Sequence, residues 1–188
     1  MNSSLKHVLG IGLLIMSETS TASAASSILF ETSQGQVEVK LLPDIAPNHV
    51  ARISQLVSEG FYDGIVFHRV IPGFMAQSGD PTGTGMGGSG VKLDAEFSDY
   101  EYRYGTVGMA RSMSPNSADS QFFICFEPAP FLDRQYTVWG QVIEGMEFVD
   151  KIKLGSSGNN GSVKDPDFMV KVSVGKPKAK EESKPKKK

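Results

Sequence analysis

An arginine inside an apolar run is the first residue of this chain that could do chemistry. Arg69 lies in the segment FHRVIPGFMAQSGD, residues 67–80, and no acidic residue follows it within five positions. Because side chains alternate along a strand, we expect Arg69 to share a face with Phe67 and Ile71. A cation among apolar neighbours is costly unless a partner uses its charge.

Two uses of this charge are open from the residues alone. Arg69 could bind a distant acid across the fold, or it could face a substrate. A guanidinium is planar, keeps its charge and carries five N–H donors, so it suits the recognition of a group that becomes an acceptor during a reaction.

The glycine-rich stretch 83–88 matches the dinucleotide-binding pattern G-x-G-x-x-G, but its context is wrong. Asp80-Pro81 precedes it where an apolar strand should end, and VKLDAEF follows it with no helix start. The chain also has no G-K-[ST] phosphate-binding loop. We therefore predict a flexible surface loop here.

Hydrolase and metal-site patterns are absent as well. A Ser-His-Asp mechanism needs a histidine on a loop near an exposed serine, whereas His49 falls in a predicted helix and His68 in a predicted strand, pointing away from Arg69. No G-x-S-x-G pattern is present either. Cys125 lies within FFICF and is expected to be a buried apolar residue. As the only cysteine, it cannot form an internal disulfide. No His, Cys, Asp or Glu spacing indicates a metal site, so we expect neither metal nor cofactor.

The elements that would position Arg69 are mostly strands. The periodicity predicts one helix that begins at Ala46-Pro47 and stops at Gly60, and a second, short helix over 146–152. The predicted strands cover residues 27–32, 36–42, 64–71, 74–79, 105–112, 120–127, 136–144 and 167–175. This pattern predicts a mainly all-β fold: a closed eight-stranded antiparallel β-barrel capped by two α-helices.

The N-terminus has the pattern of a secretory signal peptide. Lys6 and His7 precede nine apolar residues, 8–16, and Ala22-Ser23-Ala24 is an A-x-A cleavage pattern. We predict a signal peptide over 1–24 and a periplasmic or secreted domain over 25–175. Nine apolar residues are too few for a membrane span, which needs about 20, so no stable membrane insertion is expected. The alternative is an uncleaved leader on a cytoplasmic protein.

Charge is divided between the predicted domain and the C-terminus. The net charge of the chain is −2, yet residues 176–188 carry seven lysines against two glutamates. The domain is therefore acidic, which argues against a nucleic-acid partner. We predict that the tail, 176–188, is disordered and aids solubility, with weak contact to an anionic surface as the alternative.

Four segments together resemble one enzyme family. FHRVIPGFMAQSGD, GTVGMAR, NSADSQFFICFEPAPFLD and YTVWGQVIEGMEFVDKI are similar to sequences of cyclophilin-type peptidyl-prolyl cis-trans isomerases, and the resemblance covers residues 28 to about 174. It implies an eight-stranded antiparallel barrel with two capping helices, in agreement with the element pattern.

The resemblance also implies the roles of individual residues. Arg69 would be the catalytic residue, held by Gln77, which would also contact the substrate. Gln121 would line the groove, and the main chain of Ala110 and Arg111 would bind an extended peptide. The implied proline pocket is made of residues whose alternative role is ordinary core packing: Phe74, Met75, Phe123 and Leu132.

Three positions differ from the best-known eukaryotic pattern. Arg111 replaces an asparagine, Phe131 a tryptophan and Tyr136 a histidine; these changes resemble bacterial, periplasmic members of the family. Phe131 and Tyr136 remain in the implied substrate site. Because the indole N–H donor is lost at position 131, we expect cyclosporin binding to be weak.

The function that follows is rotation about X-Pro peptide bonds in proline-containing polypeptides, assisting the folding of exported proteins. A binding module that holds proline-containing segments without turnover is the alternative, and a combined isomerase and chaperone is a third. We expect a monomer.

Overall fold

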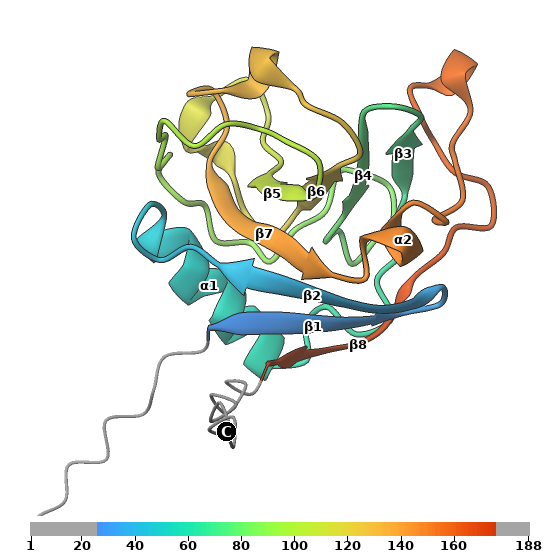
Figure 1. Cartoon of the computed structure of the whole chain (residues 1–188), viewed down its shortest axis with the longest axis horizontal. Coiled ribbons are helices and arrows are strands. Elements are labelled where there is room, and N and C mark those ends of the chain that lie inside the picture. The colour runs from blue at the N-terminus through green and yellow to red at the C-terminus, as the bar shows by residue number, and fades with distance from the viewer. Residues whose placement is uncertain (1–25, 176–188) are drawn as a thin grey trace, which may run out of the picture.

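The computed structural model describes residues 26–175. Eight antiparallel strands form one sheet that curls around a core, with two α-helices against it (Figure 1). The strand order is β3-β4-β6-β5-β7-β2-β1-β8. The eight-stranded antiparallel architecture with two helices, expected from the sequence, is confirmed. The predicted signal peptide and lysine-rich tail lie outside the described residues.

Most predicted elements are found within a few residues of their expected bounds. The helices are α1 (Pro47–Ser58) and α2 (Met146–Val149). The strands are β1 (Ser27–Thr32), β2 (Gly35–Leu41), β3 (Arg69–Ile71), β4 (Met75–Ser78), β5 (Thr106–Met109), β6 (Phe122–Cys125), β7 (Val138–Glu144) and β8 (Met169–Val174).

The predicted N-terminal hairpin is present and has a closed turn. The hydroxyl of Thr32 donates to the carbonyl of Gly35 at 2.7 Å, and the Gly35 N–H donates back to the hydroxyl at 3.1 Å. In the hairpin, β1 pairs with β2 along its whole length and with β8 on its other side. The hairpin therefore places the first strand, β1, beside the last strand, β8.

The main core lies between the curled sheet and α1. One face of α1 is buried, and its apolar side chains, Val50, Ile53, Leu56 and Val57, follow the spacing that predicted the helix. Aromatic rings fill the centre: Phe30 stacks on Phe122 at 5.5 Å, and Phe122 meets Trp139 edge-on at 5.8 Å. None of the helices within residues 26–175 is long and apolar enough to cross a membrane.

The prediction of a continuous strand over 64–71 is wrong, because regular pairing starts only at Arg69. The residues before it pair with the segment that leads into β8 instead: Phe67 N–H donates to Asp167 O at 2.8 Å, and Val66 forms a single bridge to Phe168. This segment brings the two ends of the sheet together and interrupts the alternation of faces. Arg69 and Ile71 are therefore half-buried on one side, whereas Phe67 belongs to the main core.

Candidate active site

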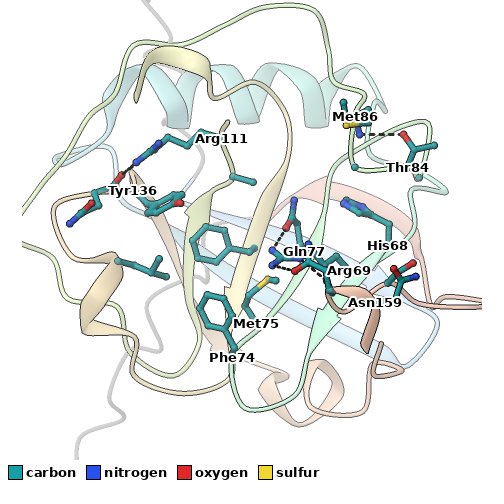
Figure 2. Close-up of a pocket in the computed structure, with 18 of the residues that line it drawn as sticks. His68, Arg69, Phe74, Met75, Gln77, Thr84, Met86, Arg111, Tyr136 and Asn159 are labelled. Atoms are coloured by element: carbon teal, nitrogen blue, oxygen red, sulfur yellow. Dashed lines mark hydrogen bonds between the residues drawn. The ribbon is translucent and has the colours of Figure 1, made fainter. Parts of the chain in front are cut away.

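A groove of about 960 Å³ opens beside β3, β4 and β6 (Figure 2). It collects ten of the eleven residues that the sequence analysis assigned to a site: Arg69, Phe74, Met75, Gln77, Ala110, Arg111, Phe123, Phe131, Leu132 and Tyr136. Gln121 lines an adjoining hollow of about 260 Å³, together with Gln77 and Arg111. Residues separated by more than 60 positions thus meet at one surface.

The floor of the groove is apolar and is part of a second core cluster. Met75, Phe123 and Leu132 are 1%, 5% and 6% exposed, and Phe74 packs against this cluster. These side chains belong to the core and also line the groove. Their packing fixes the shape of the cavity.

Arg69 is held on the wall of the groove by three hydrogen bonds. Nη1 donates to Gln77 Oε1, Nε donates to the main-chain oxygen of Asn160, and Nη2 donates to Asn160 Oδ1, each at 3.0 Å. A guanidinium has five N–H groups. Two N–H groups of Arg69 therefore remain without a partner among residues 26–175.

The environment of Arg69 favours a strong donor. Burial lowers the pKa of Arg69 from its ordinary value, while Tyr136 acts in the opposite direction. The ordinary value is so high that the side chain keeps its charge at neutral pH. A charged donor beside a poorly hydrated wall interacts more strongly with an acceptor than it would in water.

Gln77 and Gln121 connect Arg69 to the glycine-rich loop. Gln77 Nε2 donates to Gln121 Oε1 at 2.9 Å, and Gln121 Nε2 donates to the carbonyls of Gly85 and Gly87 at 3.0 and 2.8 Å. Each amide is fixed at both its oxygen and its nitrogen. The chain of bonds sets the position of the Gln77 oxygen that holds Arg69.

The glycine-rich loop lies at the surface, as predicted, and hydrogen bonds to Asp80 hold its backbone. Asp80 accepts hydrogen bonds from the N–H groups of Thr82, Gly85 and Gly87 and from the Thr82 hydroxyl, at 2.6–3.1 Å. Burial alone would raise the pKa of Asp80, but these bonds outweigh it and lower the pKa to about 2. Thr84 and Met86 in this loop line the groove. The loop does not match a dinucleotide-binding site, but its glycines provide N–H groups that bind Asp80 and carbonyls that bind Gln121.

Ala110 and Arg111, whose main chain was expected to bind a peptide, line the groove. The Ala110 N–H donates to Gln121 O at 2.9 Å, whereas no hydrogen bond found among residues 26–175 uses the Ala110 carbonyl or the Arg111 N–H. The side chain of Arg111 folds over Tyr136, with 4.4 Å from Cζ to the ring centroid, and donates to Gln135 O.

Aromatic rings form one rim of the groove. Phe131 is 64% exposed and lies tilted against Phe74 at 5.3 Å, and Tyr136 meets Phe123 edge-on at 6.0 Å. The exposed ring of Phe131 offers an apolar surface without a polar donor.

His68 was expected to point away from Arg69. His68 lines the same groove, because the alternation of faces begins only at position 69 (Figure 2). Both ring nitrogens are buried and lack a hydrogen-bond partner among the described residues. Burial lowers the pKa of His68, partly countered by Asp80, so the ring is mainly neutral at pH 7.

Asn159 and Asn160 also contribute to the groove, from a loop that begins about 90 residues downstream of Arg69, and neither was predicted from the sequence. The Asn-Asn-Gly sequence is a signal for a tight turn but not for contact with a distant arginine. Among residues 26–175, no three His, Cys, Asp or Glu side chains are grouped so that they could hold a metal ion.

Comparisons with known proteins agree with this geometry. The family model described as "Cyclophilin type peptidyl-prolyl cis-trans isomerase/CLD" matches residues 27–174. A probable peptidyl-prolyl cis-trans isomerase from Brucella suis is 52% identical over 169 residues, covering 82% of this chain and 86% of the relative. Peptidyl-prolyl cis-trans isomerase B of Bacillus subtilis is 43% identical over 122 residues, covering 64% of this chain and 85% of the relative.

Solved structures show the same fold. A cyclophilin-type peptidyl-prolyl cis-trans isomerase from Cryptosporidium parvum, crystallised in the presence of the dipeptide Ala-Pro, matches with a TM-score of 0.75 and 29% identity, covering 80% of this chain and 99% of that one. A cyclophilin from Hirschia baltica matches with a TM-score of 0.71 and 30% identity, covering 81% of this chain and 74% of that one.

Proposed function

The chain belongs to the cyclophilin-type peptidyl-prolyl cis-trans isomerases, and on this premise we propose that it acts on exported proteins, with Arg69 as its catalytic residue. As a member of this family it catalyses rotation about X-Pro bonds, and its substrates are proline-containing peptides. The observation that carries the proposed role of Arg69 is its guanidinium, fixed on the groove wall with two N–H groups still available.

The reaction needs no nucleophile and no general base, because no bond to carbon is broken. Resonance between the nitrogen lone pair and the carbonyl gives the peptide bond a rotation barrier of ~18–20 kcal/mol. For X-Pro bonds the uncatalysed exchange takes tens to hundreds of seconds. The enzyme must therefore bind the twisted amide more tightly than either planar form.

In the twisted amide, the proline nitrogen loses conjugation and becomes a hydrogen-bond acceptor. A free N–H of Arg69 donates to this nitrogen, and that bond exists only near the transition state. Such a differential interaction lowers the barrier, and each ~1.4 kcal/mol gained raises the rate about tenfold. The fixed charge of arginine makes the donor independent of pH in the neutral range.

The apolar floor takes the proline ring. Phe74, Met75, Phe123 and Leu132 line the same groove as Arg69, and Figure 2 shows Met75 beside Arg69. An apolar ring placed there is removed from water, and the adjoining peptide bond is then within reach of the guanidinium. The Ala110 carbonyl and the Arg111 N–H bind the extended peptide, while Phe131 and Tyr136 bound the rim.

Support for exported clients comes from the sequence. Residues 1–24 have the order of a secretory signal, from Lys6 through an apolar run to the Ala22-Ser23-Ala24 cleavage pattern. An isomerase delivered by this signal meets exported chains as they fold outside the cytoplasm. The periplasm is the proposed location.

A refolding assay with a secreted protein whose slow phase is limited by prolyl isomerisation tests the activity on such clients. We expect wild-type protein to accelerate the slow phase at catalytic amounts, and Arg69→Ala to remove most of this acceleration while still binding the client. Binding without acceleration by the wild type would instead favour a module that holds proline-containing segments.

The location is tested separately. Mass spectrometry of the protein recovered from fractionated native cells should give an N-terminus near Ala25 in the periplasmic fraction. An intact N-terminus in the cytoplasmic fraction would contradict the proposed location and leave the isomerase activity unaffected.

A further inference from the structure

The loop before β8 is attached along the edge of β3, next to Arg69 (Figure 1). Gly155 N–H donates to Val70 O at 2.9 Å, and Val70 N–H donates to Gly161 O at 2.8 Å. Val163 N–H donates to His68 O at 3.1 Å, so the loop is bonded to both sides of Arg69. This backbone attachment places residue 160 beside the guanidinium.

Residue 160 has a conformation that suits asparagine. Asn160 has φ 49° and ψ 34°, in the left-handed region, where asparagine is among the few non-glycine residues that occur often. Its side chain is exposed and takes no part in the core. In this conformation both oxygens of the residue, the main-chain oxygen and Oδ1, point at Arg69.

The two bonds from Asn160 occupy one edge of the guanidinium. Nε and Nη2 present parallel N–H groups on that edge, and a pair of acceptors there fixes the plane of the group as well as its position. The third bond, from Nη1 to Gln77 Oε1, acts on another nitrogen. The Asn160 bonds and the Gln77 bond together fix the direction of the two free N–H groups.

We propose that Asn160 is a positioning residue that aligns the guanidinium of Arg69 for the proline nitrogen. The inference rests on the proposed catalytic role of Arg69. Without the Oδ1 bond, the guanidinium is held at two points and can turn out of the plane required for donation. Because a small misplacement of a reacting group is expensive in rate, kcat falls while the apolar pocket, and with it KM, is unaffected.

Asn160→Gly is the sharpest variant. Glycine accepts the left-handed conformation and keeps the main-chain oxygen, so only the Oδ1 bond is lost. We expect kcat for an X-Pro peptide to fall roughly tenfold with KM within about twofold of wild type. Asn160→Asp keeps an acceptor oxygen in place and should restore kcat to within about threefold of wild type.

Asp165→Gly is the matched control. Asp165 also has a positive φ, 52°, is exposed in the same region of the chain and lies outside the groove. This variant should keep wild-type kcat, which shows that an extra glycine near the loop is not itself the cause. Loss of activity in both glycine variants would overturn the proposal in favour of a general loosening of the loop.

A measurement on the wild-type protein tests the proposal even if variants of Asn160 fail to fold. The Nε–H signal of Arg69, assigned by its disappearance in Arg69→Lys, should exchange with solvent much more slowly than the Nε–H of free arginine. Exchange as fast as in free arginine, or unchanged kcat in folded Asn160→Gly, would overturn the role of Asn160. Full activity in Arg69→Ala would instead overturn the proposed function on which this inference depends.

Discussion

The side chain of Arg69 is bound by the neutral oxygens of Gln77 and Asn160. None of the ion pairs found among residues 26–175 includes it. The alternative that sequence reasoning left open, an arginine paired with a distant acid across the fold, therefore does not describe this site. Because no carboxylate neutralises the charge of Arg69, its guanidinium can interact strongly with an acceptor on the substrate. The direction of its N–H groups then affects how well it binds that acceptor.

Replacing Arg69 by lysine tests whether catalysis needs only a positive charge or also the planar shape of the guanidinium. Lysine keeps the positive charge but cannot form the paired bonds to Asn160 and still present a donor in a fixed direction. We expect kcat for an X-Pro peptide to fall at least roughly tenfold in Arg69→Lys, as for loss of an oriented electrostatic donor. A protease-free isomerisation assay measures this, and wild-type turnover in Arg69→Lys would show that charge alone is sufficient.

Phe131 permits a prediction about cyclosporin. Its exposed ring lies on the rim, where the family's best-known eukaryotic members have a tryptophan, and it has no N–H to donate. Phe131→Trp supplies an indole donor, and one hydrogen bond contributes about 0.5–1.5 kcal/mol. We expect cyclosporin affinity, measured by calorimetry, to rise up to roughly tenfold. Unchanged or weaker binding would show that this position does not limit affinity.

Among the helices and strands, those whose formation depends on nearby residues were predicted correctly from the sequence. Alternation located the hairpin of β1 and β2, and helical spacing located α1 with Gly60 just beyond its end. The pattern failed over residues 64–68, where a long-range bridge to Phe168 replaced local pairing. No property of that segment alone reveals its partner.

In the site, too, residues within sequence motifs were predicted, whereas residues placed by long-range contacts were not. Of the eleven site residues predicted within the family's motifs, ten line the groove, and Gln121 lines the adjoining hollow. Asn160 and His68 were missed, because the first reaches Arg69 only through docking of its loop on β3 and the second changes face where regular pairing ends. Asp80 was seen only as a residue before a loop, although its carboxylate organises that loop.

Asp80→Asn tests whether the glycine-rich loop supports the site. The substitution removes the charge and turns an acceptor into a donor facing the N–H groups of Gly85 and Gly87, whose carbonyls hold Gln121. Hydrogen bonds to a charged group contribute about 1.5–3 kcal/mol each, so we expect the free energy of unfolding to fall by about 2 kcal/mol. Isomerase activity should fall as well, since Gln77 and Arg69 lose their support.

Asp94→Asn is the control for this variant. Asp94 lies on the same long segment and is exposed, so the substitution changes the net charge equally without touching a loop anchor. Urea denaturation and an isomerisation assay on both variants give the comparison. Equal stability and activity in the two would contradict the role of Asp80.

For the whole molecule, buried or half-buried carboxylates attach loops to the barrel. Burial alone would raise the pKa of each, but the hydrogen bonds that they accept outweigh it, so each pKa is lowered in the fold. These groups are Asp80 in the glycine-rich loop, Glu96 at the start of α1, Asp119 against Ser89 and Lys92, and Asp167 at the β1–β2 turn.

Lowered carboxylate pKa values predict the direction of acid sensitivity. A group with a lower pKa in the folded state stabilises the fold above its unfolded pKa of about 4, and this contribution is lost as pH falls toward the folded value. We expect Tm to change little between pH 7 and 5 from these groups and to drop below pH 4. Asp80→Asn should show a shallower drop than wild type; an equal drop, or a Tm that rises below pH 4, would contradict this account.

Exchange NMR on a peptide with a single X-Pro bond tests the central claim most directly, because it reports binding and turnover together. With wild-type protein, the cis and trans signals should exchange rapidly on the enzyme. With Arg69→Ala, the account predicts a similar bound fraction but an exchange rate lower by about two orders of magnitude, as for loss of a key electrostatic donor. An exchange rate equal to that of wild type would show that the groove isomerises proline without this guanidinium.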